Sequence, residues 1–143
     1  MNELLTQLHD SPNSLAYPLI IFGAVAAGLK VTCANAAYQA GELAHQYKDS
    51  GASHIFAHPS VIPIVTEMFS KIGVNAKSAQ NLTWQLTLDE PKGAPGVKAL
   101  DELLQGGKLS SHEKFNGKDS RETVYMCYSS GTTGLSKGVE VCG

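Results

Sequence analysis

Apolar and polar residues recur along this chain with the spacings of helices and strands. From residue 61 to residue 72, apolar side chains fall three and four positions apart, which predicts an amphipathic helix with Ser60 at its cap and Gly73 at its end. Residues 41–50 predict a second amphipathic helix. Residues 14–27 are apolar on nearly every side, so we expect a third, buried helix there.

The remaining segments predict short strands and one more helix. Runs of β-branched or alternating residues predict strands over 30–33, 54–57, 84–88 and 123–128, and apolar spacing predicts a short helix over 97–104. Residues 108–122 are polar apart from Leu109 and Phe115 and predict a surface connector. Because helical and strand segments alternate, the chain predicts an α/β fold with a parallel sheet flanked by helices.

Length and charge exclude several classes of protein. The chain has 143 residues with 11 basic and 13 acidic side chains, a net charge of −2, which suits one domain and argues against nucleic-acid binding through bulk positive charge. Its longest apolar stretch, residues 17–29, contains Pro18 and two glycines and is shorter than the roughly 20 residues of a membrane span. Three cysteines without a C-x-x-C spacing argue against a disulfide scaffold or zinc ribbon and favour an intracellular compartment.

The segment 128–139 carries the clearest chemistry, because a Gly/Ser/Thr loop follows a predicted strand directly. Glycines let backbone N–H groups close around an anion, hydroxyls donate to phosphate oxygens, and a lysine adds positive charge. The spacing of a Walker P-loop and that of a Rossmann fingerprint are both absent, and a flexible linker has a similar composition. The predicted phosphate-binding residues are Ser129, Ser130, Gly131, Thr132, Thr133, Gly134, Lys137 and Gly138.

This string, Ser-Ser-Gly-Thr-Thr-Gly-x-x-Lys-Gly, resembles the AMP-binding signature of the acyl-adenylate-forming superfamily. Ser136 stands where proline is commoner in that signature. Upstream, residues 35–38 and 42–46 resemble acyl-CoA synthetases of the 4-coumarate–CoA ligase type, with Ala36 where those enzymes usually have proline. The resemblance extends over residues 11–139, so the whole chain, 1–143, is similar to part of the large N-terminal domain of an AMP-dependent synthetase/ligase.

The resemblance implies ATP-dependent activation of a carboxylic acid as acyl-AMP, followed by transfer of the acyl group to CoA. Residues 129–134 would enclose the β- and γ-phosphates of ATP, and Lys137 would balance their charge as pyrophosphate leaves. Mg²⁺ would accompany ATP, and CoA would be the second substrate of the complete enzyme. Neither a catalytic residue nor a protein metal ligand is assigned.

Other parts of the family pattern are absent from this sequence. It has no aromatic-Gly-x-Thr-Glu motif and no later Thr-Gly-Asp motif, with which the family binds adenine, magnesium and ribose. We therefore expect the chain alone not to complete the reaction. We also expect the family's first strand and helix to be missing, or replaced by residues 1–10.

Two other interpretations stay open at this point. The chain could be a non-catalytic module that binds a nucleotide or pairs with a complementary chain or paralogue, or an adenylation fragment of a peptide synthetase. The sequence distinguishes neither the carboxylic acid nor a cytoplasmic from a peroxisomal location.

The histidines and cysteines give weaker signals. His54 and His58 are predicted to be structural rather than a metal-binding pair, because four residues of a strand span about 13 Å. His45 is predicted to be a solvated surface residue of its helix. Cys33 and Cys127 fall in strand-like runs and are predicted to be small buried side chains.

Overall fold

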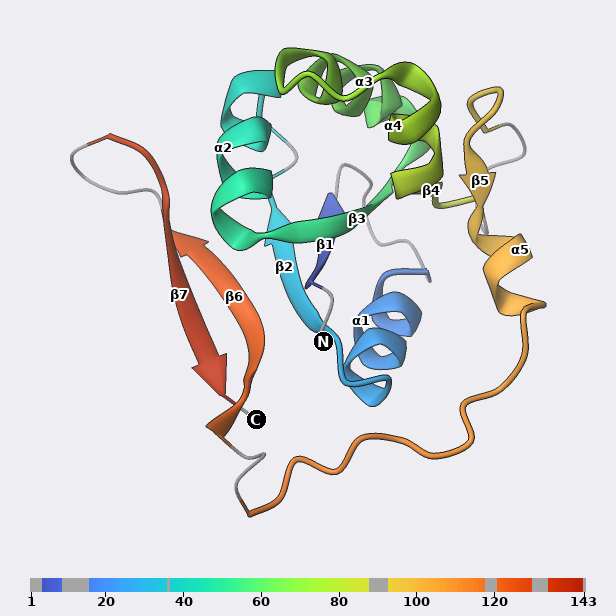
Figure 1. Cartoon of the computed structure of the whole chain (residues 1–143), viewed down its shortest axis with the longest axis vertical. Helices are drawn as coiled ribbons and strands as arrows, with labels where there is room; N and C mark the ends of the chain where they lie inside the picture. Colours follow the sequence, from blue (N-terminus) through green and yellow to red (C-terminus); the bar gives the residue numbers. More distant parts are fainter. Residues whose placement is uncertain are drawn as a thin grey trace.

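The computed structural model describes residues 4–8, 16–35, 37–87, 93–117, 121–129 and 134–142. Within them lies a seven-stranded sheet of order β5-β4-β3-β1-β2-β6-β7 (Figure 1). The strands are β1 (Leu4–Leu8), β2 (Lys30–Ala34), β3 (Ala52–Ala57), β4 (Thr83–Gln85), β5 (Lys98–Ala99), β6 (Thr123–Ser129) and β7 (Lys137–Cys142). All neighbouring strands pair in parallel except β6 and β7, which pair antiparallel.

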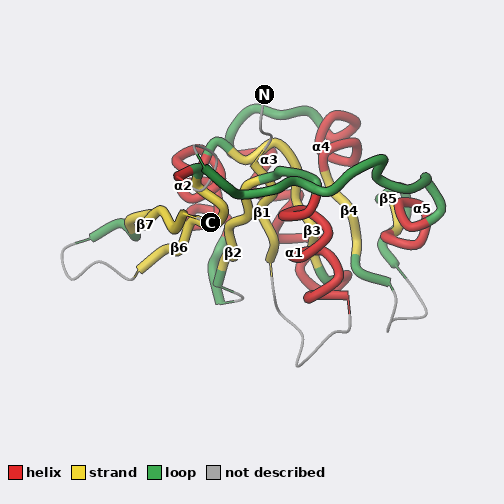
Figure 2. The backbone as a smooth tube through the Cα atoms, turned by 90° about the horizontal axis from the view of Figure 1, so that it is seen from below, coloured by secondary structure: helices red, strands yellow, loops and turns green. Residues whose placement is uncertain are grey.

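Helices cover both faces of this sheet, which confirms the predicted α/β fold (Figures 1 and 2). Helix α1 (Ala16–Ala26) packs on one face. Helices α2 (Ala40–Ser50), α3 (Ile62–Lys71) and α4 (Ala76–Leu82) lie on the other, and a short α5 (Leu100–Leu104) follows β5. Strand β3 serves both layers, because Ile55 is buried against α2 and α3 while Phe56 is buried on the α1 side.

Helix α3 and the turn before it confirm the predicted helix but not its cap. The first turn is a separate 3-10 segment, η1 (Pro59–Val61), and α3 itself begins at Ile62. His58, not Ser60, caps this start, because its Nδ1 accepts a hydrogen bond from the Ser60 backbone N–H at 3.2 Å. Pro59 and Pro63 both lie in first turns, where the missing N–H costs little.

Helix α2 follows its prediction closely. It ends at Gly51, whose φ of 69° lies in the left-handed region that side chains disfavour. Leu43 is fully buried against α3, while Glu42 and Lys48 are exposed on the opposite face. The amphipathic spacing therefore gave the end of this helix and the apolar part of its buried face, but not the burial of Gln46.

Helix α1 forms as predicted but is buried on one side only. Ile20, Ile21 and Ala24 are buried against the sheet, whereas Leu19 is 55% exposed and Phe22 is 69% exposed. The prediction of a buried helix was therefore wrong for its outer half. The reason is that the sheet packs against one side of α1, and the described residues form no second sheet or helix layer on its other side.

Several elements were missed or misplaced by the sequence patterns. Strand β1 lies in the middle of the sheet, between β2 and β3, and the sequence patterns did not predict a strand there. Helix α4 was not predicted, although Asn75 caps it by accepting from the Ser78 N–H at 3.0 Å. Strand β4 covers 83–85 rather than 84–88, and α5 begins at Leu100 rather than residue 97.

The cysteines lie in different environments. Cys33 is half-buried on the α1 face of β2, and its Sγ lies 3.2 Å from the Tyr17 hydroxyl oxygen. Burial raises the pKa of the Cys33 thiol, against a smaller lowering by the Tyr17 hydrogen bond. Cys127 is exposed, as is Cys142, so the prediction that Cys127 is buried was wrong.

Alkylation should distinguish these thiols. We expect iodoacetamide near pH 8 to modify Cys127 and Cys142 first and Cys33 last, because the thiolate is the reactive form and burial disfavours it at Cys33. Peptide mapping over a time course measures the order, and a Cys33→Ser variant should lose only the slow phase. Modification of Cys33 ahead of both other thiols would contradict the observed burial.

Candidate functional site

The β6–β7 hairpin brings the two ends of the predicted phosphate loop together. Ser129, the last residue of β6, pairs with Lys137, the first residue of β7, and Tyr128 pairs with Gly138 in the next position. Sequence reasoning predicted β6 but not β7. The returning strand is what sets Lys137 opposite the start of the loop.

The structure describes four of the eight predicted loop residues: Ser129, Gly134, Lys137 and Gly138. The other four, Ser130, Gly131, Thr132 and Thr133, lie outside the described residues. Gly134 has a φ of 141°, a conformation that residues with a side chain rarely adopt. At Gly138, an added Cβ would lie 3.0 Å from the Tyr128 ring and 3.2 Å from the Met126 side chain. A side chain at position 134 would therefore be strained by its backbone conformation, and one at position 138 would require the Tyr128 and Met126 side chains to shift.

Two hydrogen bonds tether this hairpin to helix α2, beside which it lies in Figure 1. The Tyr128 hydroxyl donates to Asp49 Oδ2 at 2.6 Å, and His45 Nε2 lies 3.1 Å from the Ser136 carbonyl oxygen. A carbonyl only accepts, so this second bond needs the proton on His45 Nε2. His45 is half-buried by the contact, and its prediction as a solvated surface residue was wrong.

The Tyr128 hydroxyl is held in its protonated form. Burial, and after it the hydrogen bond to Asp49 and the negative charge of that carboxylate, raise the pKa of the Tyr128 phenol. At neutral pH the phenol therefore remains a donor to Asp49.

A buried polar chain connects α2 to β6 through β2. Gln46 Nε2 donates to Thr32 Oγ1 at 2.9 Å and to the Cys33 carbonyl at 3.3 Å. Thr32 Oγ1 in turn donates to the Met126 carbonyl at 2.7 Å, and Gln46 and Thr32 are both fully buried. The sequence patterns did not predict these hydrogen bonds, because a glutamine on an amphipathic helix normally lies on the solvent face.

A hollow of about 670 Å³ lies between α2 and the described end of the loop, lined by His45, Asp49, Gly134, Leu135, Ser136, Lys137 and Gly138. Lys137 is exposed and supplies a cation there. Within the described part of the chain, no group of three or more His, Cys, Asp or Glu side chains could hold a metal ion.

Comparison with known proteins agrees with the loop signature. The model of a family described as AMP-binding enzyme matches residues 10–141. The chain is 30% identical to 4-coumarate–CoA ligase-like 8 of Arabidopsis thaliana over 129 residues, which is 90% of this chain and 22% of that protein. It is 28% identical over 131 residues to the peroxisomal OPC-8:0-CoA ligase 1 of the same plant, again covering 90% of the chain and 22% of the relative.

Solved structures give the same picture of the fold. The luciferase-like enzyme from the nonluminescent mealworm Zophobas morio matches with a TM-score of 0.77 at 16% identity, over 99% of this chain and 30% of that one. The chain thus spans about a fifth of the curated relatives it matches. Among the described residues, the helices are all too short or too polar to cross a membrane.

Proposed function

Because the chain belongs to the AMP-binding enzyme family, we propose that it forms the ATP phosphate-binding part of an enzyme that converts a carboxylic acid to acyl-AMP and then to a CoA thioester. The curated relatives are named as CoA ligases, which supports this reaction class. The observation that carries the assignment to this chain is the β6–β7 hairpin, which sets Ser129 opposite Lys137 at the two ends of the loop.

The loop residues have separate roles in the proposed site. Hydroxyl and backbone N–H groups from Ser129 to Gly134 would donate to phosphate oxygens, and the Lys137 ammonium would offset negative charge as pyrophosphate leaves. Mg²⁺ bound to the phosphate oxygens of ATP would neutralise part of their charge, in keeping with its preference for substrate phosphates over a protein cage. Preorganised donors of this kind favour the state in which negative charge has developed.

Helix α2 would position the loop through the hairpin that carries it. Its side chains hold the hairpin at Tyr128, before the loop, and at Ser136, near its end. Both bonds reduce the freedom of the strands that carry the donors. Less ordering is then needed when the phosphates bind, which favours tighter binding.

Replacing Lys137 by alanine should weaken nucleotide binding. We expect the dissociation constant of the chain for MgATP to rise by about tenfold, which corresponds to about 1.4 kcal/mol of lost charge interaction. Pyrophosphate should compete with MgATP, and adenosine should compete poorly, because the loop would contact the phosphates. Isothermal titration calorimetry with the purified chain measures all three quantities.

The matched control is Lys71→Ala, an equally simple loss of one lysine on the exposed face of α3. This variant should bind MgATP like the wild type. Equal losses in both lysine variants, or competition by adenosine as strong as that by pyrophosphate, would refute the proposed phosphate site. The chain alone should show no acid-dependent pyrophosphate exchange. A complete ligase that carries this segment should show exchange. If that ligase bound nucleotide without exchange, the non-catalytic alternative would be favoured.

A further inference from the structure

Two cysteines lie opposite each other on the α1 face of the sheet. Strands β2 and β6 are parallel neighbours, and Thr32 pairs with Met126. Cys33 and Cys127 are the next residues of the two strands, so the same register places them opposite each other. Cys33 packs with the residues on the α1 side of the sheet. Because Tyr128 reaches α2 from the other face and side chains alternate along a strand, Cys127 projects from the α1 side as well.

The hydroxyl of Tyr17, on α1, lies against this pair of thiols. Its oxygen is 3.2 Å from Cys33 Sγ. Burial, and after it the hydrogen bond to Cys33, raise the pKa of the Tyr17 phenol, and negative charge on Cys33 or Cys127 raises it further. At neutral pH the phenol therefore keeps its proton and can donate it in a hydrogen bond to a thiolate at Cys33.

The two thiols differ in exposure in the way that a stepwise oxidation requires. Cys127 is exposed, whereas Cys33 is half-buried. Burial raises the pKa of the Cys33 thiol, the Tyr17 hydrogen bond lowers it, and a negative charge on Cys127 raises it. An exposed thiol meets an oxidant first, and a second thiol beside it then converts the product to a disulfide. Neighbouring strands lie about 4.8 Å apart, which is within the range of Cα separations that a disulfide bridges.

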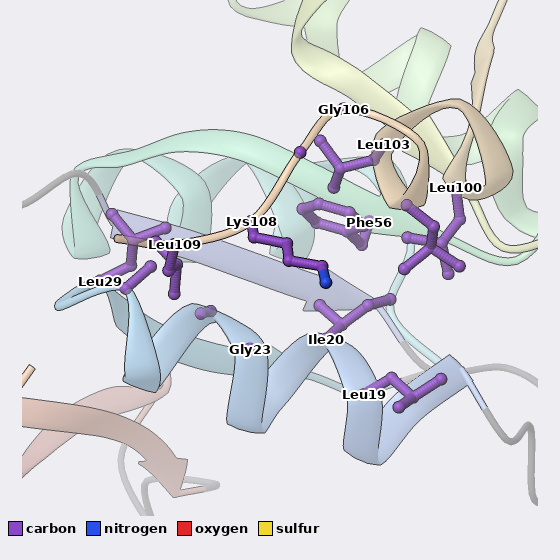
Figure 3. Close-up of a pocket in the computed structure, with 14 residues that line it drawn as sticks. Leu19, Ile20, Gly23, Leu29, Phe56, Leu100, Leu103, Gly106, Lys108 and Leu109 are labelled. Atoms are coloured by element: carbon purple, nitrogen blue, oxygen red, sulfur yellow. The ribbon is translucent and has the colours of Figure 1, made fainter. Parts of the chain in front are cut away.

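A cavity of about 500 Å³ between α1 and α5 opens on the same face of the sheet (Figure 3). Its larger lining side chains include Ile20, Phe56 and Leu100, and the described residues that line it include neither a cysteine nor a tyrosine. The thiol pair is therefore not part of this apolar cavity. An oxidant reaches Cys127 directly from solvent, because that side chain is exposed.

We propose that Cys33 and Cys127 are a modification site at which a peroxide forms a reversible disulfide. With hydrogen peroxide, the Cys127 thiolate attacks one oxygen, the O–O bond breaks, and a sulfenic acid forms at Cys127 while the other oxygen leaves as water. The Cys33 sulfur then attacks the Cys127 sulfur, the S–O bond breaks, and the leaving hydroxide takes the Cys33 proton to form a second water. Two thiols thus lose two electrons, and one peroxide gains them.

Tyr17 assists the second step by donating to the Cys33 sulfur as its proton leaves. The proposal rests on strand register and exposure, and it does not depend on the proposed phosphate site. The third cysteine of the chain provides an internal comparison, because it is exposed like Cys127 but lies elsewhere on the hairpin.

The fold and the unfolded chain favour different disulfides. In the fold, Cys142 pairs with Thr123, which is four residues from Cys127 along β6, and four residues of a strand span about 13 Å, too far for a disulfide. In the unfolded chain, Cys127 and Cys142 are 15 positions apart in sequence, whereas Cys33 and Cys127 are 94 positions apart. Loop closure there favours the bond between Cys127 and Cys142 by about 15-fold.

Treatment with hydrogen peroxide in buffer and in concentrated urea tests the proposal. Each sample is blocked with iodoacetamide, and its disulfides are identified by intact mass and peptide mapping. In buffer, the chain should lose the mass of two hydrogen atoms and yield mainly the disulfide between Cys33 and Cys127, which dithiothreitol should reverse. In urea, the disulfide between Cys127 and Cys142 should predominate instead.

Two variants separate the roles of the thiols. Cys142→Ser is the matched control and should form the disulfide in buffer at an unchanged rate. Cys33→Ser should instead accumulate sulfinic acid at Cys127, because the resolving thiol is absent.

The decisive outcomes are read in the wild-type chain, so the test does not depend on whether Cys33→Ser folds. In buffer, a main disulfide to Cys142, a disulfide between two chains, or a free Cys33 beside an overoxidised Cys127 would each overturn the proposal. The same ratio of disulfides in buffer and in urea would also overturn it, because the pairing would then owe nothing to the fold.

Discussion

Replacing Phe69 by alanine is expected to lower the free energy of unfolding by about 3–5 kcal/mol, the usual cost of deleting a buried aromatic side chain. Phe69 is 1% exposed on the inner face of α3. Its ring meets that of Tyr47 on α2 edge to face, with ring centroids 5.3 Å apart, so the substitution removes a contact between two helices as well as apolar area. Urea denaturation followed by circular dichroism measures the change.

Phe22→Ala is the matched control for this prediction, because it makes the same chemical change on α1 at a side chain that is 69% exposed. In the isolated chain it should alter the free energy of unfolding by no more than about 0.5 kcal/mol. Equal effects at the two positions would mean that α1 is as deeply buried as α3. That result would contradict the observed burial of the two side chains.

The contrast between α1 and α3 shows where sequence patterns succeed. In residues 61–72 the apolar side chains fall on one side of a helix and the polar side chains on the other. This pattern correctly predicted the helix and its buried side. The segment 14–27 has no polar face, so the pattern gave the helix but could not say which side meets the sheet. Burial of the second side depends on a neighbour, and a local pattern contains no information about whether that neighbour is present.

The missed strands have a different physical origin. Strand β1 has the sequence Leu-Leu-Thr-Gln-Leu, which neither alternates between apolar and polar residues nor contains a run of β-branched residues. All side chains of β7 are exposed, so it lacks the half-buried alternation that identifies a strand. Its place in the fold comes from antiparallel pairing with β6, a contact between residues on either side of the loop.

In the candidate site too, some features can be proposed from the sequence and others depend on the tertiary structure. The loop residues from Ser129 to Gly138 could be proposed from the sequence, because glycines, hydroxyls and a lysine are close together and resemble a known signature, and their role in phosphate binding stays a prediction. The contacts of His45, Gln46 and Asp49 could not, because each joins α2 to a segment distant in sequence. A polar residue on an amphipathic helix is normally solvated, and only the tertiary structure shows which of them instead face the sheet.

Gln46→Glu tests whether the buried polar chain holds α2 to β6. The substitution preserves shape but replaces the Nε2 donor by an acceptor facing Thr32 Oγ1 and the Cys33 carbonyl. Gln46 is fully buried, so burial would disfavour the charged form of the introduced carboxylate. We expect a loss of about 3–5 kcal/mol in the free energy of unfolding at pH 8.

The pH dependence of this loss has a defined sign. Burial favours the protonated form of the introduced carboxyl in the folded chain, while in the unfolded chain it ionises near its ordinary pKa of about 4.3. Above that pH the unfolded state binds fewer protons, so the deficit relative to wild type should grow as pH rises and shrink towards pH 4. Urea denaturation of both proteins between about pH 4.5 and 8, at steps of about half a pH unit, measures the difference in their free energies of unfolding.

Gln80→Glu makes the same change at an exposed position of α4 and should produce a deficit under about 0.5 kcal/mol with little dependence on pH. If Gln46→Glu behaved in the same way, the bond from Gln46 to Thr32 would not be formed in the protein. If instead the pH-dependent deficit is found, weaker MgATP binding should accompany it. Thr32 bonds directly to the Met126 carbonyl on β6, and Ser129 at the end of that strand begins the proposed phosphate loop.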